Sequence, residues 1–378
     1  MAFVCLGLGA CNGSAPRLPE IAAVAPSLAS VKERAPLDAL AASIELNRVV
    51  TLPTPLVALA QPTEEDTDIL RSVLTTFKSN SSPVHYADLE TCANSHPQSP
   101  WRASVLTNLG LLYYHTGYFS RAVEMLELSW GLSHEATEPR AKALADRTVG
   151  ELARMHARLG HVDRLRALFT ELGDRRYLGS ASELINNSKE ALWLMENEPG
   201  TSFKCGPFAL QQVAAQIDPS GKIASELVNV QSGRHGLTLG QLDVLATTSG
   251  LEYKAAFRKD RAAIPLPAVV HWKVNHYAAV VGFENGLYHI MDPTFADDLW
   301  MSPEALDAES SGFFLIHKSK LSGTWRAPAT QELASVYGMG ATFDSDPLAT
   351  KDDDEKTCPA CPQPPDRKRS IEHMLFRQ

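Results

Sequence analysis

Three short motifs between residues 205 and 293 constrain this chain more than any other feature. They are Cys205-Gly206-Pro207, Asn275-His276 and Met291-Asp292-Pro293. Together they supply a thiol, an imidazole and a carboxylate, in that order along the chain. A thiol attacks a carbonyl carbon as thiolate, and it then needs an imidazole as base and a third group that orients the base. Local structure decides whether folding brings these groups together.

The segment after Cys205 is predicted to be a helix that runs from Phe208 to Ile217. Pro207 fits the first turn of this helix, because its missing N–H costs nothing there. Cys205 would then lie just outside the helix N-terminus. The unpaired backbone N–H groups and the positive end of the helix dipole would favour thiolate over thiol there and could hold an oxyanion. Taken alone, Cys205 is equally compatible with a small buried apolar residue.

Apolar runs predict three strands, at residues 268–272, 276–283 and 287–292. The turn between the last two decides their register. With a two-residue turn at Asn285-Gly286, Asp292 would fall on the face away from His276. A three-residue loop with Gly286 in a left-handed bulge instead pairs Phe283 with Leu287. His276 and Asp292 then become diagonal neighbours about 7–8 Å apart at the backbone, so the sequence analysis expects the bulged turn.

Two further histidines lie on the predicted strands. His271 ends the first strand beside Trp272, and His289 falls on the face opposite Asp292 in the bulged register. A strand histidine without a charged neighbour is more often structural than catalytic. His276 is therefore the favoured imidazole.

The segment from Thr201 to Lys318 resembles the double-glycine cysteine peptidases that mature bacteriocin leaders. The runs that carry the resemblance are 203–210, 266–272, 275–281 and 290–293. That family has a papain-like α+β fold and a Cys-His-Asp triad. The resemblance therefore implies that Cys205 is the nucleophile, His276 the general base and Asp292 the group that orients it. It also fits a helix predicted at 238–250, which begins with Thr and Gln spaced as a capping box.

The chain departs from that family at the oxyanion hole. The resembled peptidases carry a glutamine several residues before the cysteine, whereas residues 196–201 contain none. The remaining candidates are the Cys205 backbone and, weakly, Asn197. Because loss of one oxyanion donor costs roughly 10²–10³ in rate, two alternatives stay open. One is a catalytically inactive module that binds a leader peptide or a partner, and the other is a transferase or amidase that uses the same thioester chemistry.

Residues 62–195 are predicted to be all α-helical. One helix pair follows the spacing of a tetratricopeptide repeat, with small residues where two helices approach and large ones between them: Trp101, Leu109-Gly110, Tyr113, Gly117, Phe119 and Ala122. A looser copy is displaced by 43 residues along the chain, with Leu152 at the position that corresponds to Leu109. An earlier pair is expected at 67–78 and 86–94. Such repeats present a concave face, on which a protein partner or the substrate could dock.

The N-terminal segment 1–61 combines an apolar start with an Ala/Pro-rich tether that has one short helix near 37–46. Leu8 to Cys11 resembles a lipobox, which makes Cys11 a lipidation candidate. The apolar run before it, however, lacks the preceding Lys or Arg that a signal peptide normally has. If the lipobox is genuine, the protein belongs to the bacterial cell envelope or is secreted, and a lipid anchor is its one expected membrane contact. Otherwise it is cytoplasmic. The net charge of -9 argues against nucleic acid as a partner.

Residues 319–378 are expected to be a linker and a disordered tail. Cys358 and Cys361 form a lone Cys-x-x-Cys, too few ligands for structural zinc, so neither metal nor cofactor is expected. Residues 332–341 look like a degraded leader that contains Gly338, Gly340 and Ala341. We therefore expect either cleavage in cis near Gly340-Ala341 or a plain glycine-containing linker.

The expected substrate is a peptide or protein, including the chain's own C-terminal segment or a covalently linked domain. The combination of helical repeats with such a domain also resembles the leading part of large Rhs/YD-repeat toxin-like proteins. In that interpretation this chain is a truncated form.

Overall fold

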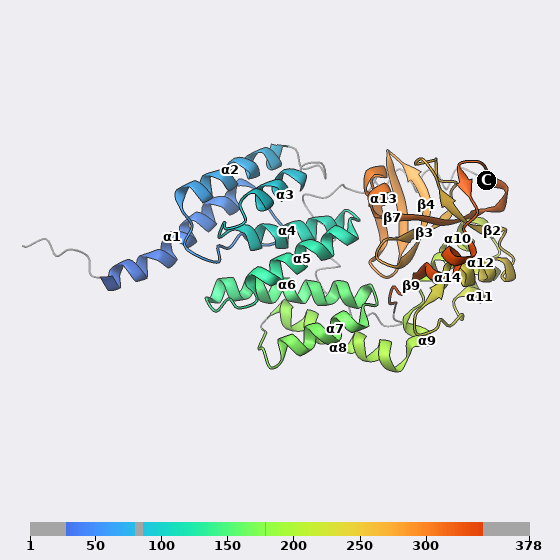
Figure 1. Ribbon diagram of the computed structural model, residues 1–378, viewed down its shortest axis with the longest axis horizontal. Coiled ribbons are helices and arrows are strands. Elements are labelled where there is room, and N and C mark those ends of the chain that lie inside the picture. Colours follow the sequence, from blue (N-terminus) through green and yellow to red (C-terminus); the bar gives the residue numbers. More distant parts are fainter. Residues whose placement is uncertain (1–27, 80–85, 178, 343–378) are drawn as a thin grey trace, which may run out of the picture.

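The computed structural model describes residues 28–79, 86–177 and 179–342. A stack of helices forms one part of the molecule, and a β-sheet with its own helices forms the other (Figure 1). Cys11, Cys358 and Cys361 lie outside the described residues, so lipidation and the Cys-x-x-Cys pair stay predictions. Among the described residues, no helix is long and apolar enough to cross a membrane.

The helical part consists of helices that pack in sequence order. They are α1 (Leu28–Val49), α2 (Glu64–Ser79), α3 (Tyr86–Ser95), α4 (Arg102–His115), α5 (Phe119–Ser133), α6 (Pro139–Arg158), α7 (Val162–Leu172) and α8 (Ser180–Asn197). The expected helix pairs are present as α2/α3, α4/α5 and α6/α7. A Cβ on Gly110 would lie 2.7 Å from Leu126 Cγ, so a small residue does allow α4 and α5 to approach closely. The assignment to tetratricopeptide repeats stays a prediction.

The segment expected to be a tether belongs to this helical part. Helix α1 is longer than the helix expected at 37–46, and Leu46 and Leu56 are completely buried. The Thr54 N–H donates to Asn108 Oδ1 at 2.8 Å, deep in α4. Apolar residues scattered among Ala and Pro were thus enough to pack this segment onto the helices, so the expectation of a loose tether fails for these residues.

The second part is built on an antiparallel sheet with the strand order β6-β5-β4-β3-β7-β2-β8. Its strands are β2 (Tyr253–Arg258), β3 (Ala268–Trp272), β4 (His276–Glu284), β5 (Leu287–Asp292), β6 (Ala296–Met301), β7 (Ser310–His317) and β8 (Trp325–Arg326). Its helices are α9 (Pro199–Ser202), α10 (Cys205–Ile217), α11 (Lys222–Leu227), α12 (Leu239–Thr248), α13 (Pro303–Glu309) and α14 (Thr330–Ser335). A separate short pair joins β1 (Leu237–Thr238) to β9 (Tyr337–Gly338). Helices and strands mix as expected for an α+β domain.

The two faces of the sheet serve two cores. Val269 and Ala279 point to a core shared with α10 and α12. Their neighbours Val270, Ala278 and Val280 point to a core that is continuous with the stacked helices. Alternation along a strand therefore explains why β3 and the start of β4 are apolar on both faces.

Residues 319–342 differ from the expected linker. Trp325 is 4% exposed and lies in β8, which pairs with β2. The chain then forms α14 and β9, which pairs with β1. Two effects account for this packing: burial of the apolar Trp325 side chain, and backbone hydrogen bonds from β8 to β2, which would otherwise be an edge strand.

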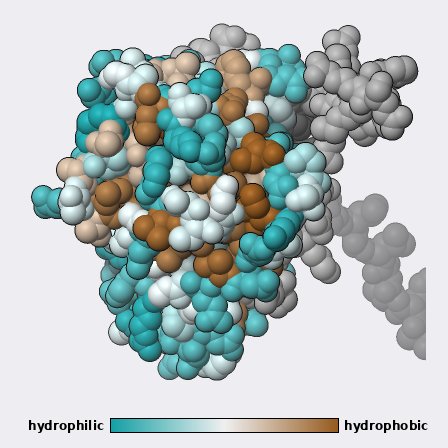
Figure 2. Space-filling model, turned by 90° about the vertical axis from the view of Figure 1, so that its right-hand side faces the viewer, coloured by the Kyte–Doolittle hydropathy of each residue, from teal (hydrophilic) through white to brown (hydrophobic). Residues whose placement is uncertain are grey.

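The sheet domain turns one face away from the stacked helices. Figure 2 shows this side, where apolar patches are interspersed with hydrophilic residues. Scattered apolar side chains of this kind are normal for a protein surface.

Candidate functional site

Cys205 is the first residue of α10, with Lys204 at the N-cap position. The helix thus starts one turn earlier than expected, and the sulfur lies at its N-terminus. Pro207 occupies the first turn, where no hydrogen bond requires its N–H. The backbone N–H groups of the first turn of a helix have no partner within the helix, so they are free to bind an anion. Cys205 is 2% exposed.

His276 and Asp292 form a buried pair. His276 Nε2 donates to Asp292 Oδ2 at 2.6 Å, and the two residues are 0% and 1% exposed. The other carboxylate oxygen, Oδ1, accepts the Thr294 N–H at 3.0 Å. Both carboxylate oxygens are therefore hydrogen-bonded, which fixes the acid and, through it, the imidazole ring.

The turn between β4 and β5 is not the one expected from the sequence. Asn285 and Gly286 have positive φ angles of 50° and 82°, and Glu284 pairs with Leu287. This is the two-residue turn that Asn-Gly favours, because its twist matches that of the strands. The expectation of a three-residue bulged loop is therefore wrong.

The extra residue lies inside β4 instead. Val280 pairs with Ile290, whereas Gly282 pairs with His289, which leaves Val281 as a β-bulge. A bulge inserts one residue into one strand and shifts every later pairing by one. A regular β4 would have placed the imidazole and the carboxylate on opposite faces of the sheet.

The bulge restores the face that the sequence analysis required. Beyond it, Ala279 pairs with Met291, so His276 and Asp292 lie on the same face as diagonal neighbours. The expected geometry is thus produced by a β-bulge inside β4 rather than by a bulged turn.

The charge state of His276 follows from its neighbours. Burial lowers the pKa of the ring, but the charge of Asp292, the hydrogen bond to it and the nearby sulfur of Cys205 together raise this pKa to about 10. Among the described residues, no group makes a hydrogen bond of standard geometry to the buried Nδ1. The ring is thus a cation that lies next to the sulfur.

The C-terminal segment fills the space in front of these groups. A Cβ on Gly338 would lie 3.1 Å from Cys205 Sγ, and a Cβ on Gly340 would lie 1.8 Å from His276 Nδ1. Figure 1 shows β9 between the stacked helices and the sheet domain. The processing candidates Gly338 and Gly340 therefore lie directly against the thiol and the imidazole.

Sequence reasoning missed several residues that hold this segment. His271 Nε2 donates to the Tyr337 carbonyl at 2.8 Å, and Asn275 accepts the Met339 N–H through its carbonyl at 2.8 Å. Burial lowers the pKa of His271 to about 4, so its ring is neutral. Asn275 has a positive φ of 58°, and an Asn that directly precedes the histidine was a signal for such a turn.

His289 has a structural role. Its ring contacts Asp298 through a hydrogen bond and stacks on Trp300, with 4.4 Å between ring centroids. It lies on the opposite face of β5 from Asp292, as the sequence analysis expected. These contacts account for the residue without catalysis.

Asn197, the weak oxyanion candidate, is the last residue of α8 and is exposed. Its Nδ2 donates to the Trp193 carbonyl of the same helix at 2.8 Å. This side chain is thus held on its own helix rather than directed at the buried sulfur. The backbone N–H groups at the start of α10 remain the candidate donors.

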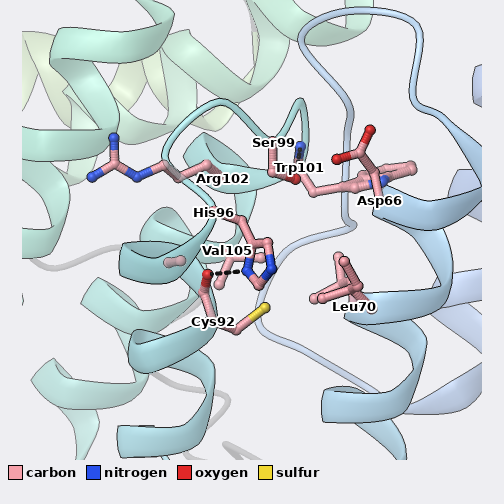
Figure 3. A pocket seen from close by; sticks show the side chains of 10 residues that line it. Asp66, Leu70, Cys92, His96, Ser99, Trp101, Arg102 and Val105 are labelled. Carbon is pink, nitrogen blue, oxygen red and sulfur yellow. Dashed lines mark hydrogen bonds between the residues drawn. The ribbon is translucent and has the colours of Figure 1, made fainter.

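A second thiol and imidazole lie together at the C-terminal end of α3, with Cys92 in its last turn and His96 directly after it. Figure 3 shows Cys92 and His96 beside Leu70 and Trp101, around a cavity of about 10 Å³. His96 Nδ1 donates to the Cys92 carbonyl at 3.0 Å, and burial raises the pKa of the Cys92 thiol. The cavity holds about one water molecule, so this pair is part of the helix packing. No cluster suited to a metal ion occurs in the described parts of the chain.

Comparisons with known proteins address the sheet domain. A solved structure, described as the crystal structure of a double glycine motif protease from AMS/PCAT transporter in complex with the leader peptide, aligns with 30% of this chain and 81% of its own, at 23% sequence identity and a TM-score of 0.24. No curated protein matches this chain. Residues 200–322 match the model of the Peptidase C39 family. This part of the chain is therefore a peptidase C39 domain, from a family of cysteine peptidases.

Proposed function

We propose that this protein is a cysteine peptidase that hydrolyses a peptide bond at glycine-containing processing sites. The observation that carries the proposal is the buried His276–Asp292 pair beside a cysteine at a helix start. The match of residues 200–322 to the C39 family supports the same reaction class.

The proposed mechanism assigns one role to each group. The Cys205 thiolate attacks the carbonyl carbon of the bound peptide, and the N–H groups at the start of α10 stabilise the oxyanion. Protonated His276 gives its Nδ1 proton to the leaving nitrogen, and the C–N bond breaks. Water, deprotonated by His276, then hydrolyses the thioester. Asp292 keeps the ring oriented and stabilises its positive charge.

The absent glutamine affects the expected rate. With backbone donors alone, we expect a reaction slower by roughly 10²–10³ than with a complete oxyanion hole. Processing of a linked or tethered peptide tolerates such a rate, because the local concentration of the substrate is high.

A second candidate, a peptide-binding module without catalysis, is favoured by one observation. Cys205 is 2% exposed because the cleft in front of it is filled by the chain itself. A module that only holds a glycine-containing peptide would use the same contacts.

The proposal also divides the chain differently from the sequence analysis. We infer that the helical part ends at Asn197 and that the peptidase unit extends from Pro199 to Thr342. The residues after the expected boundary at 318 include β8, α14 and β9, which pair with or pack on the sheet domain.

The test uses the full chain and a synthetic peptide that covers its residues 328–346. Mass spectrometry follows both, in the wild type and in Cys205→Ala, with Cys92→Ala as the matched control. We expect cleavage by the wild type and by Cys92→Ala, and none by Cys205→Ala. A product with a free carboxylate indicates hydrolysis, whereas an adduct mass indicates transfer. If folded wild-type protein cuts neither itself nor the peptide, the binding module is the correct function.

A further inference from the structure

The segment that follows the sheet domain is bound in its cleft like a ligand. It comprises α14, β9 and residues 339–342, and we call it the cleft segment. Its helix α14 packs on α12, and its strand β9 pairs with β1. The inference drawn from it rests on the proposed peptidase function.

The helix of the cleft segment is anchored by a Glu-Leu pair. Glu332 accepts two hydrogen bonds from Arg326, at 2.7 and 2.6 Å, and one from the Ala329 N–H at 2.7 Å. Leu333 packs into the core around α12, where its carbonyl oxygen would be 3.1 Å from a Cβ on Gly240. The pair thus holds α14 through one charged and one apolar contact.

Beyond α14 the chain is extended, and both walls of the cleft bind its backbone. The hydrogen bonds are Leu239 N–H to Val336 O at 2.7 Å, Met339 N–H to Asn275 O, Ala341 N–H to Arg158 O and Thr342 N–H to Ser202 O, the last three at 2.8 Å. Arg158 belongs to α6, so the helical part forms one wall. Backbone pairing of this kind is how an extended peptide is recognised by a sheet edge.

Glycines let the cleft segment reach the reactive groups. A Cβ on Gly338 would lie 2.3 Å from Tyr277 Cδ2, and a Cβ on Gly340 would lie 1.8 Å from His276 Nδ1. Real Cβ atoms do not approach heavy atoms to less than 3.0 Å. Opposite the segment, Gly160 would place a Cβ 2.0 Å from the Met339 carbonyl oxygen. A side chain at any of these positions would push the backbone away from the site.

The position of His276 identifies the bond. Its Nδ1 is buried, makes no hydrogen bond of standard geometry to the described residues and faces the Gly340 backbone. Gly338 lies against the sulfur of Cys205, and Gly340 lies against the imidazole of His276. The Met339–Gly340 bond therefore has the thiol on its acyl side and the imidazole on its amine side. The Gly340-Ala341 bond, expected from the sequence, does not fit, because the Ala341 N–H donates to Arg158 O instead.

We propose that the cleft segment is the protein's own substrate and that Cys205 cuts it in cis between Met339 and Gly340. The thiolate forms a bond to the Met339 carbonyl carbon, the bond from that carbon to the Gly340 nitrogen breaks, and the His276 Nδ1 proton goes to this nitrogen. Water then donates hydroxide to the acyl carbon and a proton to His276, which frees the thiol and leaves a carboxylate on Met339.

The bound state precedes attack. The Met339 carbonyl oxygen faces Gly160 rather than the start of α10, so the peptide plane must rotate before the oxyanion can form. After the cut, α14 and β9 keep their contacts, and Met339 remains in the cleft. The reaction is therefore a single turnover that frees Gly340 and the residues after it.

The experiment follows the intact mass of the full chain after a pulse of cell-free synthesis. We compare the wild type, Cys205→Ala, Gly340→Val and the control Gly323→Ala, whose added Cβ meets no heavy atom within 4 Å. We expect a new N-terminus at Gly340 in the wild type and in Gly323→Ala, at a rate independent of protein concentration. Cys205→Ala should stay intact, and Gly340→Val should be slower by about 100-fold or more, because the backbone is displaced.

Other outcomes separate this inference from the proposed function. If the chain stays intact but cuts the 328–346 peptide added in trans, the peptidase stands and the cleft segment is an inhibitor. If neither is cut, both proposals fail. Cutting at Gly340-Ala341, or a rate that rises with protein concentration, would overturn the assigned bond or the reaction in cis.

Discussion

The substitution Gly338→Ala tests the contact between the cleft segment and the thiol. The added Cβ would lie 2.3 and 2.7 Å from two ring carbons of Tyr277 and 3.1 Å from Cys205 Sγ. Tyr277 is 1% exposed, its ring packs beside His271 at 4.9 Å between centroids, and it cannot move aside easily. The backbone of residue 338 must therefore shift.

The size of the shift sets the expected effect. Ordinary contacts of a Cβ lie at 3.4–4 Å, so the backbone has to retreat by about 1 Å from the ring. A misplacement of about 1 Å costs on the order of 10² in rate when the attacking and attacked atoms must be aligned. This factor corresponds to about 2.7 kcal/mol of activation free energy.

The assay is the pulse of cell-free synthesis described for the wild type, with Gly323→Ala as control. Intact mass gives the fraction cut at each time. We expect Gly338→Ala to be slower by about 100-fold, while thermal unfolding of the sheet domain changes little. Equal rates for the two variants would refute the placement of Gly338 against the sulfur.

Three further predictions concern the reactive groups. Asp292→Asn removes the charge that raises the pKa of His276, so the alkaline limb of the pH–rate profile, where the imidazolium is lost, should move to lower pH; an unchanged limb would contradict the assigned pair. In the Gly338→Ala protein, iodoacetamide at pH 6 should modify Cys205 before Cys92, because burial raises the pKa of the Cys92 thiol; peptide mapping reads both sites, and equal labelling counts against the assignment. Deletion of Val281 should remove the bulge without changing the pairing on either side of it, because Val280 and Gly282 then follow each other opposite Ile290 and His289; His276 and Asp292 stay on one face, so cleavage followed by intact mass should persist, and its loss in a protein with native-like circular dichroism would contradict the assigned bulge.

Local signals in the sequence predicted the elements that carry the site. The Thr238–Gln241 capping box is present, with hydrogen bonds of 3.2 and 2.8 Å, and it starts α12. Strands β3 and β5 have the predicted bounds. These features depend on neighbours a few residues apart, and such patterns can be recognised in a single sequence.

The register of β4 shows where such reasoning stops. Asn285-Gly286 is a clear turn signal, but a two-residue turn followed by a regular strand would place His276 and Asp292 on opposite faces. The structure keeps both the turn and the pairing, because Val281 bulges. An isolated glycine inside a strand often marks a bulge, so Gly282 was the available local signal, and the expectation of a bulged loop overlooked it.

Long-range packing was beyond the sequence for a different reason. The contact of Ala341 with Arg158 joins residues on separate parts of the chain, and no periodicity refers to it. The same holds for Thr54 on Asn108 and for Trp325 on the sheet. Segments rich in Ala, Pro and Gly were expected to be loose on the basis of their composition. This expectation failed because composition indicates flexibility only when no partner surface is available.

The helical part acts on the site through the loop that follows Asp292. Phe295 packs edge-on against the His276 ring at 5.2 Å and stacks on Phe119 of α5 at 4.0 Å between centroids. Tyr114 of α4 donates its hydroxyl to the Phe295 carbonyl at 3.0 Å, and Arg158 donates to the carbonyl of the preceding residue.

These contacts make the helices a positioning element. The Asp292 loop is fixed from the helical side, and the imidazole is enclosed between this loop and the sheet. The core is continuous from the helices into β3 and β4, so a fragment that begins near residue 200 would expose apolar surface and release Phe295. The proposed catalytic groups all lie in the sheet domain, but the geometry that aligns them depends on both parts of the chain.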